Sequence, residues 1–120
     1  MLKVFVYYNL HKKCFSIKAL EGASKGLVFL HSNAVELYYA EFKVSQAGRE
    51  RVLREKRKNV HAGVVGYLAD FHVDNYNTSE MTSVTYNPYL YTSFVTAETK
   101  NPIKSADKVL LKDRKIFAQL

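Results

Sequence analysis

The side chains best suited to acid–base or nucleophilic chemistry are scattered along the chain. The histidines are His11, His31, His61 and His72, and the single cysteine is Cys14. No pair of histidines has the H-x-x-x-H or H-E-x-x-H spacing of zinc sites, and one cysteine is too few for a structural zinc site. His11 and Cys14 are better explained as a turn histidine beside a core thiol than as two metal ligands. We therefore predict no metal site and no cofactor.

Catalysis by these groups would require a spacing that the sequence does not show. Cys14 lies within an expected strand, where small buried cysteines are usually inert. Metal-independent RNA cleavage would use histidines and cations as acid, base and phosphate clamp. His11, His61 and the basic residues supply those types, but in no recognisable arrangement. We expect a protein that is not an enzyme, and a small metal-independent ribonuclease is the third function that we consider.

Cations are concentrated in one stretch of the chain. The segment from 45 to 62 reads SQAGRERVLREKRKNVHA, with six lysines and arginines but only two glutamates. The whole chain has a net charge of +7 and a pI near 9.5, which favours an anionic partner such as nucleic acid or an acidic protein surface. The residues predicted to contact it, which include a basic pair from an early turn, are Arg49, Arg51, Arg54, Lys56, Arg57, Lys58, His61, Lys12 and Lys13.

Two further features would support binding to nucleic acid. Basic residues also surround Asp113 in the expected last hairpin, at Lys112, Arg114 and Lys115. Tyrosines in loops can stack on unpaired bases, and the candidates are Tyr76, Tyr89 and Tyr91. Packing at strand ends and turns is the alternative explanation for these rings. No RNA- or DNA-binding motif is present, so the signal is compositional.

The basic segment is expected to form a helix over 46–58. Ser45 is a good N-cap because its hydroxyl can accept a free backbone N–H, whereas Gly48 weakens the helix by about 1 kcal/mol relative to alanine. The apolar side chains between 49 and 58 are Val52 and Leu53. The helix should therefore dock through a narrow edge and leave most of its cations in solvent.

Both flanks of this helix read as strands. They are rich in valine, tyrosine and phenylalanine, and apolar residues alternate with polar ones. A length of 120 residues with 48% hydrophobic residues indicates a single domain over 1–120. We predict the α+β class, with a mostly antiparallel β-sheet, either a small barrel or two β-meanders, and one basic helix between the halves. In the expected strand from 60 to 73, the alternation changes phase beside Gly63 and Gly66, which predicts a β-bulge or sharp bend.

The two halves echo each other. The pattern V-x-Y-N occurs at 6–9 and at 84–87, and residues 32–37 match 106–111 without gaps. A duplication would make residues 4–42 and 84–118 β-repeats that flank the helix. Short turns and alternation that coincide by chance are the alternative.

Four segments carry a resemblance to a known family. They are YYNLHKKCFSIKA, RVLREKRKNVHA, YNPYLYTSFV and PIKSADKVLL, which are spread over nearly the whole chain. Together they are similar to a family of short, uncharacterised proteins of tailed bacteriophages. The resemblance implies a viral accessory protein in the cytoplasm of an infected bacterium, and it transfers no catalytic residue.

Composition agrees with that setting. A single cysteine excludes an intramolecular disulfide and suits a reducing cytoplasm, and no apolar run reaches the roughly 20 residues of a membrane span. We expect a cytoplasmic protein, without a membrane partner, that binds nucleic acid or a host nucleoprotein complex through the basic helix. The alternative is an inhibitor or regulator that docks on an acidic face of a host or defence protein. A homo-oligomer is compatible with either.

Overall fold

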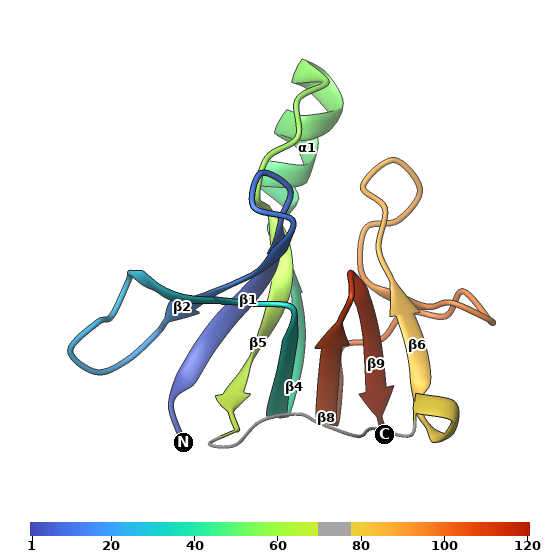
Figure 1. Cartoon of the computed structure of the whole chain (residues 1–120). Coiled ribbons are helices and arrows are strands. Elements are labelled where there is room, and N and C mark those ends of the chain that lie inside the picture. Colours follow the sequence, from blue (N-terminus) through green and yellow to red (C-terminus); the bar gives the residue numbers. More distant parts are fainter. Residues whose placement is uncertain (70–77) are drawn as a thin grey trace.

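The chain folds as one antiparallel sheet with a helix inserted between two of its strands (Figure 1). The computed structural model describes residues 1–69 and 78–120. Its elements are β1 (Lys3–Asn9), β2 (Cys14–Ala19), β3 (Val28–Ser32), β4 (Ala34–Val44), α1 (Gln46–Glu55), β5 (Ala62–Leu68), the 3-10 turn η1 (Thr78–Glu80), β6 (Thr82–Thr85), β7 (Val95–Thr96), β8 (Ser105–Lys112) and β9 (Lys115–Gln119).

Within residues 1–69 and 78–120 the sheet is open and nine-stranded, in the order β3-β2-β1-β5-β4-β8-β9-β6-β7. The predicted α+β class is therefore confirmed, and of the two predicted sheet forms the closed barrel is not the one adopted. The helix is shorter than predicted, because α1 ends at Glu55 rather than at 58. The expected strand from 60 to 73 begins at Ala62 and is a strand to Leu68, and residues 70–73 lie outside the described residues.

The strand order is similar, but not equal, on the two sides of the central β4–β8 pair. On one side β5, β1, β2 and β3 follow β4, and on the other β9, β6 and β7 follow β8, so β3 has no counterpart among the described strands. At the centre, Val35 lies opposite Leu111 and Leu37 lies opposite Val109. The sequence matches equate Val35 with Val109 and Leu37 with Leu111, so a duplication would map one of these residue pairs onto the other. The duplication itself stays a prediction.

One hydrophobic cluster draws on both halves of the sheet. It includes Val4, Val6 and Ile17 from the first half and Val84, Val109 and Ala118 from the second. Alternation in the strands explains this, because successive side chains point to opposite faces and only one set faces the cluster. This shared burial, at roughly 25 cal/mol per Å² of apolar surface removed from water, helps to hold the two halves together beside the β4–β8 pairing.

The predicted bulge occurs, but in the neighbouring strand. β5 pairs with β1 without a shift in register, so the phase change does not mark a defect in β5. The register shifts instead in β4 between Tyr38 and Glu41, opposite Gly66. Tyr39 has a φ of 51°, a left-handed conformation that non-glycine residues rarely adopt. Gly66 permits the close approach, since a Cβ on it would lie 3.1 Å from the carbonyl oxygen of Tyr38.

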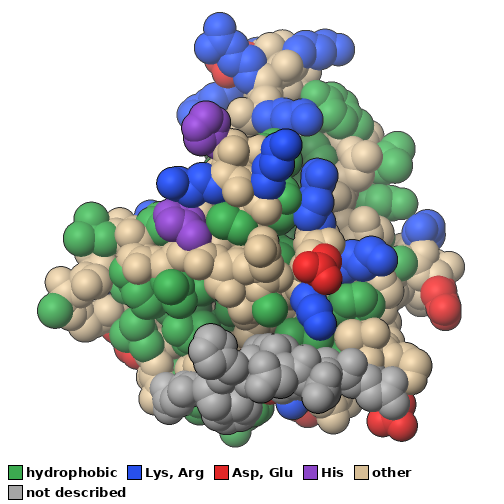
Figure 2. Space-filling view, in the orientation of Figure 1, with side chains coloured by type: hydrophobic (Ala, Val, Ile, Leu, Met, Phe, Trp, Pro, Cys, Tyr) green, Lys and Arg blue, Asp and Glu red, His purple; other side chains and the backbone are tan. Residues whose placement is uncertain are grey.

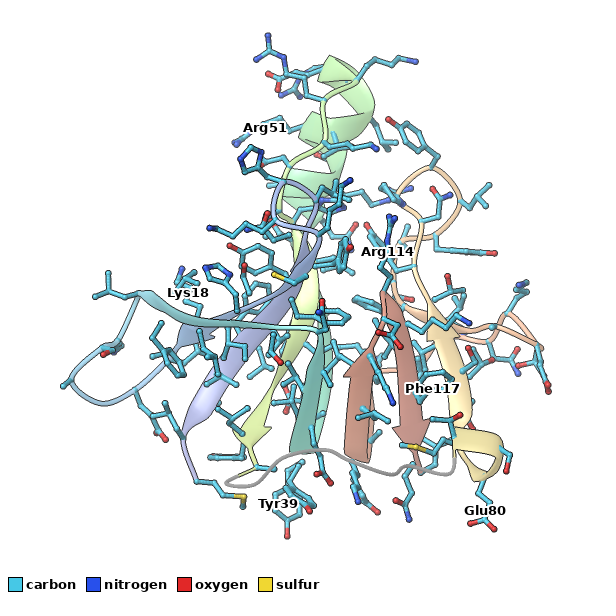
Figure 3. The ribbon with its side chains drawn as sticks, viewed as in Figure 1. Lys18, Tyr39, Arg51, Glu80, Arg114 and Phe117 are labelled. Atoms are coloured by element: carbon cyan, nitrogen blue, oxygen red, sulfur yellow. The ribbon has the colours of Figure 1, made fainter. Side chains whose placement is uncertain are left out.

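This bulge marks the lower end of the molecule in Figure 3, where Tyr39 is labelled, while Arg51 lies near the upper end and Arg114 lies between them, near mid-height. A bulge bends its strand and increases the local twist. Because β4 and β8 are antiparallel, helix α1 and the β8–β9 turn follow opposite ends of this strand pair. Both nevertheless lie toward the same end of the sheet, which we attribute to the bend in β4.

Candidate nucleic-acid interface

Local capping sets both ends of helix α1. Ser45 is the N-cap, and its Oγ accepts a hydrogen bond of 3.2 Å from the backbone N–H of Gly48. Lys56 adopts a left-handed conformation and its backbone N–H donates to the carbonyl of Val52. That cap ends the helix before Arg57 and Lys58, which lie in the irregular connection between α1 and β5. Val52 is the buried residue of the helix, so the predicted narrow docking edge is confirmed.

Polar contacts tie the helix to the loop between β6 and β7. The Arg49 Nε donates to the carbonyl oxygens of Pro88 and Tyr91, at 3.0 and 2.9 Å. The Gln46 side chain donates to the carbonyl of Thr92 at 2.8 Å. Arg49 is therefore half-buried and holds two segments of backbone together. Arg49 therefore stabilises the contact between the helix and this loop, whereas the cations around it face solvent.

His61 also lies beneath the helix. Its Nδ1 is 2.8 Å from the carbonyl oxygen of Asn59, and its Nε2 is 2.8 Å from the hydroxyl of Tyr86. A carbonyl can only accept, so Nδ1 carries a proton, and in the neutral ring Nε2 accepts from the hydroxyl of Tyr86. Burial raises the pKa of Tyr86 and nearby Arg49 partly offsets this, so its hydroxyl remains a donor at neutral pH. Both ring nitrogens of His61 and the Nε of Arg49 are thus engaged in contacts within the fold. Contacts with a partner would therefore come from the other predicted cations.

We expect that only glycine fits without strain at position 48, where helix α1 approaches His61. A Cβ on Gly48 would lie 2.7 Å from the Cβ of His61, closer than real carbon atoms approach. Gly48→Ala should therefore lower the free energy of unfolding by about 1–2 kcal/mol, although alanine favours helix by about 1 kcal/mol. Urea unfolding followed by circular dichroism measures this. Ala47→Gly, at an exposed neighbouring position, is the control for helix propensity alone. A Gly48→Ala protein more stable than wild type would contradict the expectation.

The remaining predicted cations are exposed and gather toward one end of the molecule. Figure 2 shows lysine and arginine side chains concentrated from the tip of the helix down to the level of the hairpin turns. We call this surface the basic end and define it by the helix and its C-terminal extension together with two hairpin turns: Arg51, Arg54, Lys56, Arg57, Lys58, Lys12, Lys13, Lys112, Arg114 and Lys115. Lys112 is half-buried and the others are exposed.

The two hairpin turns are fixed next to each other. The guanidinium of Arg114 lies over the ring of Tyr8, 4.8 Å from its centre, and Tyr8 directly precedes the β1–β2 turn. In that turn, the side-chain oxygen of Asn9 accepts from the backbone N–H groups of His11 and Lys12, both at 3.0 Å. The contact across the sheet joins turns that lie about a hundred residues apart in sequence. Sequence reasoning identified these cations separately but not their proximity.

Carboxylates neutralise little of this surface. The ion pairs of the described residues are Lys43 with Glu41 and Lys108 with the buried Glu36, and neither involves a cation of the basic end. Shallow hollows lie at the bulge, and the larger, about 420 Å³, is lined by Tyr39, Glu41, Asp107 and neighbouring residues. Across residues 1–69 and 78–120, no group of three or more histidine, cysteine or acidic side chains could hold a metal ion. The strongest charge feature of the described surface is therefore the basic end.

Sequence reasoning missed the contribution of the β6–β7 loop. The residues Asn87-Pro88-Tyr89 are typical of a turn, but nothing in the local sequence indicates that the carbonyl groups of this loop accept from Arg49. Tyr76, one of the tyrosines suggested for stacking, lies outside the described residues, as does His72. None of the helices in the described ranges is long and apolar enough to cross a membrane.

Comparisons with known proteins agree with the phage resemblance. A family model described as Mycobacterium phage L5 gene 82 protein matches residues 1–119. The gene 82 protein of Mycobacterium phage L5 is 42% identical over 123 residues, which cover 98% of this chain and 95% of that protein. No solved structure matches the chain. The chain therefore belongs to the phage protein family of the Mycobacterium phage L5 gene 82 protein.

Proposed function

We propose that this phage protein is a non-enzymatic accessory protein that binds nucleic acid, or a nucleoprotein complex of the host cytoplasm, through the basic end. The observation that carries the proposal is that cations from α1, from the segment after it and from two hairpin turns share one exposed end without carboxylate partners among the described residues. Lysine and arginine side chains in such an array attract phosphates and release condensed counterions.

The arrangement favours contacts to the backbone of the nucleic acid over reading of base sequence. Cations lie at several positions around the helix and on separate turns, whereas sequence readers place a few side chains from one helix face into a groove. Arg51 and Arg54 are on α1, while Arg57 and Lys58 follow its left-handed cap. Binding should therefore depend weakly on sequence and strongly on ionic strength.

We expect affinity for oligonucleotides to fall steeply with salt. If about six phosphates are neutralised, the dissociation constant should rise about a thousandfold between about 50 and 200 mM salt. Fluorescence anisotropy of a labelled oligonucleotide, titrated at several salt concentrations, measures the slope. The same titration with an uncharged-backbone oligonucleotide is the control, because it offers no phosphates to release counterions. Binding that is absent at low salt, or unaffected by salt, would refute the proposal.

An inhibitor or regulator of a host or defence protein is the second candidate. The observation that favours it is that apolar side chains lie near the cations, with Leu10 47%, Val60 53% and Leu90 68% exposed. Polar rims around apolar residues are typical of protein interfaces. A pull-down from bacterial lysate, with and without nuclease, separates the two. Capture of one acidic protein that survives nuclease treatment favours the inhibitor, and capture lost on nuclease treatment favours nucleic-acid binding.

A further inference from the structure

We propose that the basic end recognises single-stranded nucleic acid, with the ring of Tyr89 as a platform on which an unpaired base stacks. This inference rests on the proposed function and names the class of nucleic acid that it would select. It is carried by the conformation of the β6–β7 loop, by the exposure of one ring on it and by the cations to which that loop is bonded.

The backbone of the loop that carries Tyr89 is fixed by hydrogen bonds. The side-chain oxygen of Asn87 accepts from the N–H of Tyr89 at 2.9 Å. The carbonyl of Asn87 accepts from the N–H groups of Leu90 and Tyr91, at 3.1 and 2.9 Å. Arg49 then binds the carbonyl oxygens on either side of the loop tip. A platform held in this way loses little conformational entropy when a ligand binds.

The ring of Tyr89 takes little part in the folding of the loop. Tyr89 is 57% exposed, whereas Tyr86 packs against Phe94 and His61, with ring centres 5.0 and 5.5 Å away. Tyr91 is half-buried. Of the described tyrosines suggested from sequence for stacking, Tyr89 is therefore the exposed one. An exposed aromatic ring on a rigid loop indicates a ligand with a flat apolar face.

The loop that carries Tyr89 is bonded to the cationic helix, and this indicates which class of ligand would bind there. The loop is bonded to α1 through Gln46 and Arg49, and this helix and the segment after it carry the exposed arginines and lysines. A ligand that contacts both must combine flat rings with closely spaced negative charge, as nucleotides do. In a duplex the bases are stacked on one another and offer no free face, so an unpaired strand fits this surface better.

The test compares three labelled probes at low salt. They are an oligothymidylate of about twelve nucleotides, an abasic strand of the same length and a duplex of the same number of base pairs. We expect the wild-type protein to bind the oligothymidylate most tightly. Tyr89→Ala should weaken that binding roughly tenfold and leave the abasic strand and the duplex unchanged. Tyr89→Phe should retain the affinity, because the ring face is kept.

The matched control is Phe29→Ala, which removes a ring that is 42% exposed in β3, at the opposite edge of the sheet from the β6–β7 loop, and should change no affinity. Circular dichroism and urea unfolding establish that each variant is folded. Equal weakening by Tyr89→Ala on all three probes, or unchanged binding of the oligothymidylate, overturns the inference and leaves the proposed function standing. If the folded wild-type protein binds none of the three probes, both are overturned.

Discussion

The triple variant Arg54→Glu, Arg57→Glu and Lys58→Glu is expected to lose measurable binding to oligonucleotides at low salt. Each exchange removes a phosphate contact and places a carboxylate where the phosphates approach. Counterion release from fewer contacts lowers affinity by powers of ten, and the added repulsion lowers it further. All three side chains are exposed, so the loss is expected without unfolding. The fold should lose about 1 kcal/mol or less, mainly from glutamate at the C-terminal turn of α1.

The matched control variant makes the same change in net charge at exposed positions outside the basic end. Lys25→Glu, Lys100→Glu and Lys104→Glu alter exposed lysines of the β2–β3 loop and of the β7–β8 connection. This variant should keep most of the affinity, because contacts at the basic end are untouched. Equal loss in the two triple variants would show that net charge alone matters. An unchanged affinity of the first variant would exclude the basic end as the binding surface.

The sequence predicts the helix well at its start and less well at its end. The hydroxyl of Ser45 caps the helix as expected, and Val52 is the expected point of contact with the rest of the fold. Both depend on neighbours in sequence, to which local patterns are sensitive. The early end depends on the left-handed conformation of Lys56, a residue type that gives no cue for it. Most of the predicted cations lie at the basic end, but Arg49 binds carbonyl groups 39 and 42 residues away, which no local pattern contains.

The sheet shows the same division between local and distant causes. Alternation predicts the strands, and the antiparallel α+β class follows from them. The sequence does not predict the location of the bulge, because that location depends on how β4 and β5 pair. Gly66 marks the place from one strand, while the extra residue and the strained conformation belong to Tyr39 in the other. Because that bulge bends β4, a feature that the sequence assigns to the wrong strand helps to bring Arg114 toward the same end as the helix.

Gly63→Ala is expected to be the most destabilising of the single substitutions considered, with a loss of about 3 kcal/mol in the free energy of unfolding. A Cβ on Gly63 would lie 2.5 Å from the carbonyl oxygen of Val6 and 2.6 Å from the ring of Phe5. A side chain can rotate away from such a clash, but the carbonyl of Val6 belongs to a strand that pairs on both sides. β1 and β5 must therefore separate, at the cost of packing in the shared core.

Gly66→Ala is the matched control in the same strand, and urea unfolding of both variants measures the difference. Its Cβ would lie 3.1 Å from the nearest atoms, so small shifts of β4 can accommodate it and its loss should be clearly smaller. Because small domains are stable by only about 5–15 kcal/mol, the loss in Gly63→Ala should also lower the yield of folded protein. The separated strands would displace the β1–β2 turn with Lys12 and Lys13, so the folded fraction should bind oligonucleotides more weakly. If the Gly63→Ala protein were as stable as wild type, β1 and β5 could not be packed as closely as the structure places them.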